Sequence, residues 1–385
     1  EELLSLGAEG LSELAGMVKP PEVGGDAQAR YLVGGITFYA ARPEADEARQ
    51  RVEQAWLTVL TTIEHRELRA FFIRRLQQCG TPASLEALVG FLPDPSLTEP
   101  ASQALLAIDA PGTGAHLLVA LEAGEGDLKT LIQALGILEY DKAAAPIRRH
   151  AASAEDPGIQ AVALDALAVI GPVKRFFGWN KKSFTLLSSA CQTSNRYARA
   201  EALGRCLRYT EKAAACGAKR AAKKATRALL TMSRERGEIA VEAAALAMLA
   251  DIDQKRGFAA ITAAIQGEDR ALSVAGVKLL VRIGDDATPA LVRALADSAP
   301  PVRAAALNVL EPGVAPPVTA AVLEAVADTN GVVQIAALGA AARLSGRDAL
   351  PAILGELDAT NQTVQAAIGD ALLLVATPED MALLA

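Results

Sequence analysis

The chain has 385 residues, of which 51% are hydrophobic but only 4% aromatic, and its formal net charge is −7. A single compact core stops growing at about 250–300 residues, so the chain must divide or extend. Its Ala, Leu and Val content favours closely packed helices over sheets, which predicts an all-α fold. The longest apolar run, residues 32–41, is about half of the roughly 20 residues that cross a bilayer, so no membrane span is expected.

Residues 1–66 are predicted to form an N-terminal helical cap. Proline and glycine pairs within residues 20–25 end a first helix. Residues 30–41 form a second helix, and a longer amphipathic helix follows with Trp56 on its apolar face. Repeat arrays need atypical terminal units to cover the exposed end of their core, and this segment lacks the repeat described next.

Most of the remaining chain repeats a short pattern. The segment 299–310 recurs at 331–338 and 362–368, and upstream at 156–167. A sustained period near 31 residues indicates a repeat architecture. The aligned anchor residues are Leu68, Leu97, Leu128, Ile159, Val241, Val274, Val302, Val333 and Val364.

Each period is predicted to contain two helices. In one period, residues 287–295 form a short helix with Pro289 in its first turn, where a missing amide is tolerated. Residues 297–301 interrupt the pattern, and Val302 opens a second helix. Its predicted apolar face comprises Val302, Ala305, Ala306, Val309 and Leu310. Because so short a helix cannot bury that face alone, neighbouring repeats must stack into a solenoid.

This pattern resembles the HEAT repeat, in which an Asp after the first helix and an Arg early in the second form a ladder along the stack. The Asp occurs at Asp297, Asp328 and Asp358, and the Arg position holds Arg69, Lys129, Gln160, Arg303, Gln334 and Gln365. The resemblance implies an armadillo-like, right-handed α-α superhelix of about ten two-helix repeats. HEAT repeats are expected over residues 67–171 and 237–385.

Residues 172–236 interrupt the array as a basic, aromatic-rich helical insert. The insert holds 16 Lys+Arg against three acids, a net charge of +13, whereas the rest of the chain has a net charge of −20. Helices are expected from Arg196 to about Cys216 and, after a break at Gly217, through Arg234. This part resembles a helical hairpin in HEAT modules of bacterial multidomain proteins, some of them exported and fused to sugar hydrolase or cytochrome c domains.

The four cysteines predict no disulfide. Cys206 and Cys216 lie ten residues apart on one predicted helix, about 15 Å apart, which is too far to bridge. Cys191 and Cys206 flank a turn at unequal distances and are not expected to face each other. Cysteine usage therefore leaves the compartment, cytoplasmic or exported, open.

No catalytic, cofactor-binding or metal-ligating constellation is recognisable. The three histidines, His65, His116 and His150, fall in separate repeats without the spacing of a metal site. The glycine-containing turns lack the pattern that cradles phosphate. The sequence therefore predicts a protein that is not an enzyme and uses no cofactor.

The preferred interpretation is a protein-interaction scaffold that binds a partner protein or a neighbouring domain. Three alternatives remain open: a nucleic-acid-binding protein that uses the insert, the non-catalytic module of a larger exported bacterial carbohydrate-active enzyme, and an enzyme on a helical-repeat frame. The last would need a clustered acid or Cys in the concave groove, and the sequence shows no such cluster. The basic insert itself has three readings, a face paired internally with acids, a docking surface for an acidic protein, or a nucleic-acid site. The oligomeric state is left open.

The expected contact residues lie in two places. In the insert they are Lys174, Arg175, Trp179, Lys181 and Lys182. On the second helices of the C-terminal repeats they are Arg303, Asn308, Gln334 and Gln365. The apolar residues 381–385 predict a further domain or subunit beside the last repeat.

Overall fold

The computed structural model describes residues 7–175, 178–180, 182–378 and 380. Its secondary structure is helical apart from one two-stranded hairpin, so the predicted all-α class is confirmed. The chain divides into two compact units, unit 1 (Glu1–Lys212) and unit 2 (Ala213–Ala385). None of the described helices is both long and apolar enough to cross a membrane. The apolar residues 381–385 and the candidate Lys181 lie outside the described residues.

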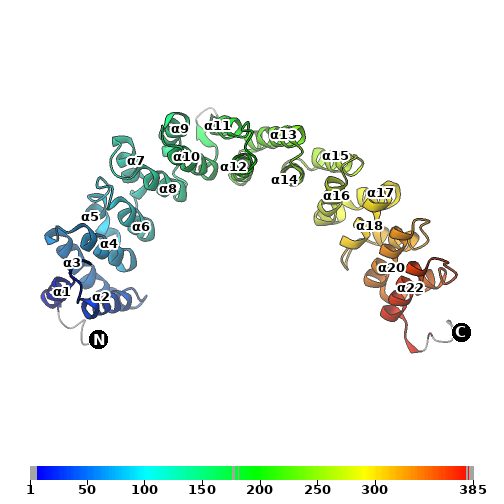
Figure 1. Ribbon diagram of the computed structural model, residues 1–385, viewed down its shortest axis with the longest axis horizontal. Coiled ribbons are helices and arrows are strands. Elements are labelled where there is room, and N and C mark those ends of the chain that lie inside the picture. The colour runs from blue at the N-terminus through cyan, green and yellow to red at the C-terminus, as the bar shows by residue number, and fades with distance from the viewer. Residues whose placement is uncertain (1–6, 176–177, 181, 379, 381–385) are drawn as a thin grey trace. The chain divides into compact units, whose positions relative to one another are not determined.

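Unit 1 is a two-layered stack of helices. Helices α4, α6, α8 and α10 pack successively and form one layer, and helices such as α7 and α9 cover them in the other (Figure 1). The elements are α1 (Gly7–Gly16), α2 (Ala27–Ala40), α3 (Asp46–Thr62), α4 (Arg66–Cys79), η2 (Pro82–Ser84), α5 (Leu85–Val89), α6 (Thr98–Ile108), α7 (Thr113–Ala123), α8 (Leu128–Ile137), η3 (Asp141–Ala143), α9 (Ala144–Ser153), α10 (Pro157–Ile170), β1 (Val173–Arg175), β2 (Gly178–Asn180), α11 (Lys182–Ala190) and α12 (Arg196–Ala215).

One continuous apolar core runs through unit 1 from Leu11 to Ile170. Trp56 is fully buried in it, as its place on the apolar face of the third helix predicts, and packs against Phe72 with the ring centroids 5.3 Å apart. Its indole N–H donates to Thr37 Oγ1, so the buried donor is satisfied.

Unit 2 repeats the same two-layered arrangement. Helices α14, α16, α18, α20 and α22 pack successively, and α15, α17 and α19 lie in the other layer (Figure 1). Its elements are α13 (Lys219–Arg236), α14 (Ile239–Ile252), α15 (Gln254–Ile265), α16 (Arg270–Ile283), η4 (Gly284–Ala287), α17 (Thr288–Asp297), α18 (Pro300–Val309), α19 (Pro316–Ala325), α20 (Gly331–Ser345), η5 (Gly346–Ala349), α21 (Leu350–Leu354) and α22 (Gln362–Val375).

Helix boundaries in unit 2 follow the local signals in the sequence. Pro289 occupies the first turn of α17, as predicted. Helix α18 begins at Pro300, two residues before the predicted Val302, because two prolines at its start need no amide partners. Its buried face, Val302, Ala304, Ala306 and Leu307, is shifted from the predicted one, since α18 packs against both α16 and α20.

The insert contains both predicted helices, α12 and α13, with Gly217 between them in a left-handed conformation, φ +78°. The prediction was incomplete at its start, where β1 and β2 pair antiparallel and Lys174 lies opposite Trp179. Aromatic residues favour strands, which suits a short strand pair in this segment. The boundary between the two units falls in the last turn of α12.

The expectation for the cysteine pair was wrong. Cys191 follows α11 and Cys206 lies on α12, and their Sγ atoms are 3.7 Å apart in the interior of unit 1. The connection between α11 and α12 is short, so the two helices fold back on each other and bring the thiols together despite the unequal spacing. Both are free cysteines.

Candidate functional site: an apolar groove on unit 1

A groove of about 390 Å³ crosses helices α6, α8 and α10 of unit 1. These are the second helices of three successive repeats, so the groove lies along the stacking direction. Its volume falls within the range of ligand pockets, about 300–1,000 Å³. It is lined by Glu99, Ser102, Gln103, Thr130, Gln133, Ala134, Gly136, Ile137, Val162, Asp165, Ala166 and Val169.

The floor of the groove is apolar because small residues let the helices approach closely. A Cβ on Gly136 would lie 3.0 Å from the Cβ of Ala166, so the glycine permits the close contact of α8 with α10. Ile137, at the end of α8, keeps 64% of its surface exposed. An exposed aliphatic side chain beside a small-residue floor offers apolar surface that a ligand can bury.

One polar group in the groove lacks a partner. Ser102 is fully buried, and its Oγ has no hydrogen-bond partner among the described residues. A buried hydroxyl left unpaired costs about 1–3 kcal/mol, and native proteins rarely leave one so. Gln103 and Gln133 add two exposed amides beside the floor. The groove can thus accept apolar side chains and hydrogen-bond to a backbone.

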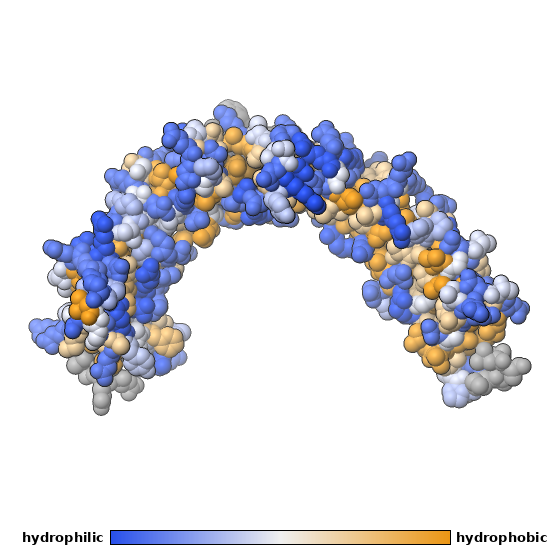
Figure 2. Space-filling model, viewed as in Figure 1, coloured by the Kyte–Doolittle hydropathy of each residue, from blue (hydrophilic) through white to orange (hydrophobic). Residues whose placement is uncertain are grey.

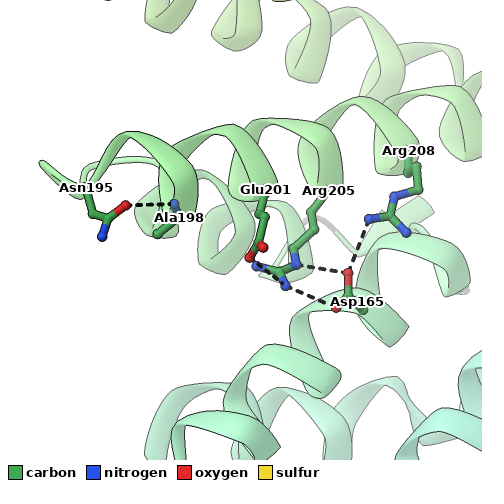
Figure 3. Close-up of polar contacts among 6 residues, drawn as sticks. All are labelled: Asp165, Asn195, Ala198, Glu201, Arg205 and Arg208. Carbon is green, nitrogen blue, oxygen red and sulfur yellow. Dashed lines mark hydrogen bonds and ion pairs between the residues drawn. The ribbon is translucent and has the colours of Figure 1, made fainter.

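The groove ends at an ion-pair cluster that joins it to the insert. Arg205 Nε and Nη2 donate to the two carboxylate oxygens of Asp165, at 2.9 and 3.0 Å, and Arg208 Nη2 donates at 3.2 Å (Figure 3). Glu201 lies 3.8 Å from Arg205 on the same helix. The bonds to Asp165 raise the pKa of Arg205 despite partial burial. Asn195 begins α12 by accepting from the backbone N–H of Ala198.

Several cations of the insert pair with carboxylates. Lys212 contacts Glu139, Lys223 donates to Asp253 at 2.9 Å, and Arg234 donates to Glu242 at 2.6 Å. Together with the pairs of Arg205 and Arg208, these contacts support the reading of a basic face paired with the acids of the neighbouring repeats.

The residues predicted as contacts in the insert are only partly described. Lys174 and Arg175 lie on β1, and Trp179 lies on β2. Lys182 is exposed at the start of α11. Lys182 does not line the groove.

Two of the four predicted contact residues in unit 2, Arg303 and Gln334, form the ladder between repeats, whereas Gln365 bonds within its own repeat. Arg303 Nη2 donates to Asp328 at 2.7 Å. Gln334 donates to Glu356 at 2.8 Å, and Gln365 donates to the carbonyl of Ala359 at 2.7 Å. In unit 1, Lys129 pairs in the same way with Asp156, at 2.7 Å.

Asn308 is exposed on α18 and makes no side-chain bond among the described residues. The groove was not predicted, because the expected contacts on second helices were confined to residues 237–385. The same rule applied to residues 98–170 leads to Gln103, Gln133 and Asp165.

A second cavity, of about 420 Å³, lies on α4 next to Phe71. The side chains of its three arginines are already ion-paired with carboxylates, so they are less available to a ligand than the polar groups of the groove. The pairs are Arg30 with Asp26, Arg66 with Asp94, and Arg74 with Glu99. Among the described residues, no group of three or more His, Cys, Asp or Glu side chains is arranged to hold a metal ion.

No protein-family model matches the sequence, and no curated protein matches it. Solved structures do match. The karyopherin Kap121p bound to the extreme C-terminus of the phosphatase Cdc14p aligns with a TM-score of 0.54 and 14% identity, over 96% of this chain and 46% of Kap121p. Kap121p bound to Ste12p aligns with a TM-score of 0.52 and 13% identity, over 98% and 46%. The chain thus spans about half the length of these karyopherins, and it shares with them the HEAT-type α-solenoid fold.

Proposed function

We propose that this chain is a non-enzymatic scaffold that binds a segment of a partner protein in the groove on α6, α8 and α10. The single observation that carries the proposal is the apolar floor beside the unpaired, fully buried hydroxyl of Ser102. A peptide supplies aliphatic side chains for such a floor and N–H and C=O groups for the hydroxyl and the two amides.

The fold supports the same reading. Helical solenoids present extended surfaces along the stack, and the similar Kap121p structures hold protein partners, a Cdc14p segment in one and Ste12p in another. Binding nucleic acid through the whole insert has less support, because five of its cations are engaged by carboxylates.

The test begins with a peptide selected from a random displayed library on the wild-type chain, whose affinity is then measured by calorimetry. Ile137→Glu places a charge in the groove and is expected to weaken binding about tenfold or more, because a buried anchor contact is lost. Val119→Glu is the matched control, since Val119 is 66% exposed against 64% for Ile137 and lies on α7, outside the groove.

Equal affinities of the two variants for the selected peptide would contradict the proposal. Ser102→Ala provides a second readout. It removes the unpaired hydroxyl, so we expect unchanged or higher thermal stability together with weaker peptide binding. A purely structural role for Ser102 would instead lower the stability.

A further inference from the structure

Helix α13 of unit 2 carries a row of cations on its solvent face. Arg220, Lys224 and Arg227, spaced i, i+4 and i+7, form this row, which we call the α13 stripe. All three side chains are exposed, and the opposite face of the helix packs on α14 through buried residues such as Ala221 and Leu229. Figure 2 shows hydrophilic residues gathered over α13.

The stripe differs from the neighbouring cations because it is unpaired. Two other cations of α13, Lys223 and Arg234, reach Asp253 and Glu242. Within the described part of the chain, no carboxylate lies within 4.0 Å of the Arg220, Lys224 or Arg227 side-chain nitrogens. The three cations of the stripe are therefore not neutralised by carboxylates of the described residues.

These positions are unfavourable for the helix alone. Like charges at i and i+4, as in Arg220 and Lys224, destabilise a helix by about 0.2–0.5 kcal/mol per pair. Lys219 and Arg220 also lie in the first turn, where cations oppose the helix dipole, and the N-cap residue Ala218 provides no side-chain cap. A local conflict without compensation inside the fold is expected at functional sites.

We propose that the α13 stripe is a docking surface for a short acidic peptide segment of a partner protein. From Arg220 to Arg227 the stripe is about 10 Å long, which three or four residues of an extended peptide cover. Carboxylates bound there would relieve the repulsion along the stripe and complement the cations of the first turn.

Charge and composition favour an acidic peptide over a nucleic acid. Outside α13, unit 2 holds nine Lys+Arg against 18 Asp+Glu, so a long polyanion would meet repulsion beyond the stripe. Helix α13 contains no aromatic residue on which bases could stack.

A membrane surface fits less well, because no large apolar side chain of α13 is exposed for insertion into lipid. The stripe shares no residue with the groove on unit 1, so either proposal can fail without the other.

The test uses fluorescence anisotropy with a labelled 12-residue Glu- and Asp-rich peptide, its Gln and Asn counterpart, and a 15-nucleotide oligothymidylate. Vesicles with 30% anionic lipid are assayed by sedimentation. The test variant is Arg220→Glu/Lys224→Glu/Arg227→Glu, with the Gln version as a milder form. The matched control, Arg270→Glu/Lys278→Glu/Arg293→Glu, makes the same charge change at three other exposed cations of unit 2.

We expect the acidic peptide to bind the wild-type chain and its neutral counterpart not to bind. The test variant should lose about tenfold or more in affinity, and the control about twofold or less. The affinity should also fall as salt rises from about 20 to 150 mM. The test variant should melt no lower than the wild type, because it removes like-charge repulsion.

Three results would overturn the proposal. The first is an acidic-peptide affinity that the test variant and the control reduce equally. The second is tighter binding of oligothymidylate than of the acidic peptide, which would assign the stripe to nucleic acid. The third is sedimentation with anionic vesicles that depends on the stripe and exceeds peptide binding.

Discussion

Cys191 Sγ lies 3.7 Å from Cys206 Sγ, and both thiols are buried in unit 1. The contact with Cys191 and burial together raise the pKa of Cys206, so this thiol stays protonated and reacts slowly. We predict that Ellman's reagent modifies the exposed Cys216 first, and that the dithiol oxidant diamide then joins Cys191 to Cys206. Peptide mass spectrometry after alkylation identifies the bridge.

Closing this loop of about 15 residues should stabilise the oxidised chain by about 3 kcal/mol, seen as a higher melting temperature. Cys206→Ser serves as the control, in which the gain should vanish. A bridge that includes Cys216 or Cys79 would contradict the observed pairing.

Removal of Asp165 should destabilise unit 1. Arg205 keeps only 11% of its side chain exposed, so Asp165→Ala leaves a largely buried guanidinium without its two-pronged partner. We expect a loss of about 1–3 kcal/mol in the free energy of unfolding, measured with urea. Arg208→Ala should cost about 0–1 kcal/mol, because Arg208 is 53% exposed. Equal losses would show that the bonds of Arg205 are not the dominant contact.

Acid should weaken the ladder contact between Lys129 and Asp156. The hydrogen bond from Lys129 and the Gly158 N–H hold the pKa of Asp156 below its ordinary value. A carboxyl with a lowered folded pKa contributes stability above its unfolded pKa and loses it as the pH falls through the folded pKa. The loss should thus develop below about pH 4.

We expect Asp156→Asn to flatten this acid limb of the melting temperature while it keeps most of the stability at pH 7, since an amide oxygen still accepts from Gly158 N–H. Melting curves from pH 2.5 to 7 check the expectation. An acid limb as steep as that of the wild type would assign the pH dependence to other carboxyls.

Two helical glycines should respond oppositely to alanine. A Cβ on Gly257 would lie 2.2 Å from Ala250 Cα, so Gly257→Ala must force α14 and α15 apart. Gly35, within α2, has nothing within 4 Å of the same position, so Gly35→Ala should stabilise by about 0.5–1 kcal/mol. Thermal melts should show a lower melting temperature for Gly257→Ala and a higher one for Gly35→Ala than for the wild type. A stabilising Gly257→Ala would contradict the close crossing.

The fold could be predicted because its signals are local and repeated. Proline at a helix start, as at Pro289, and apolar positions at helical spacing recur along the array. A helix boundary that is ambiguous in one repeat can therefore be predicted by comparison with the next repeat. The Asp and Arg ladder positions were recognised from the same alignment. The partner of Gln334 could not be predicted, because whether its side chain faces solvent or Glu356 depends on the side chains of the next repeat.

The groove and the thiol pair could not be predicted, since both depend on how the helices pack. The close approach of α8 and α10 at the floor of the groove depends on the contact of Gly136 with Ala166, which lie 30 residues apart in the sequence. The meeting of Cys191 with Cys206 depends on the short connection between α11 and α12. Neither arrangement has a signature in residue spacing alone.

The ladder bonds have a consequence for how such a chain changes in evolution. Lys129 with Asp156, and Arg303 with Asp328, each join one repeat to the next repeat only. Because of this nearest-neighbour coupling, the contacts that stabilise each repeat are made only with the two repeats that flank it. Duplication or deletion of a whole period therefore disturbs only the joints at the point of change, and the ladder bonds elsewhere in the array are kept.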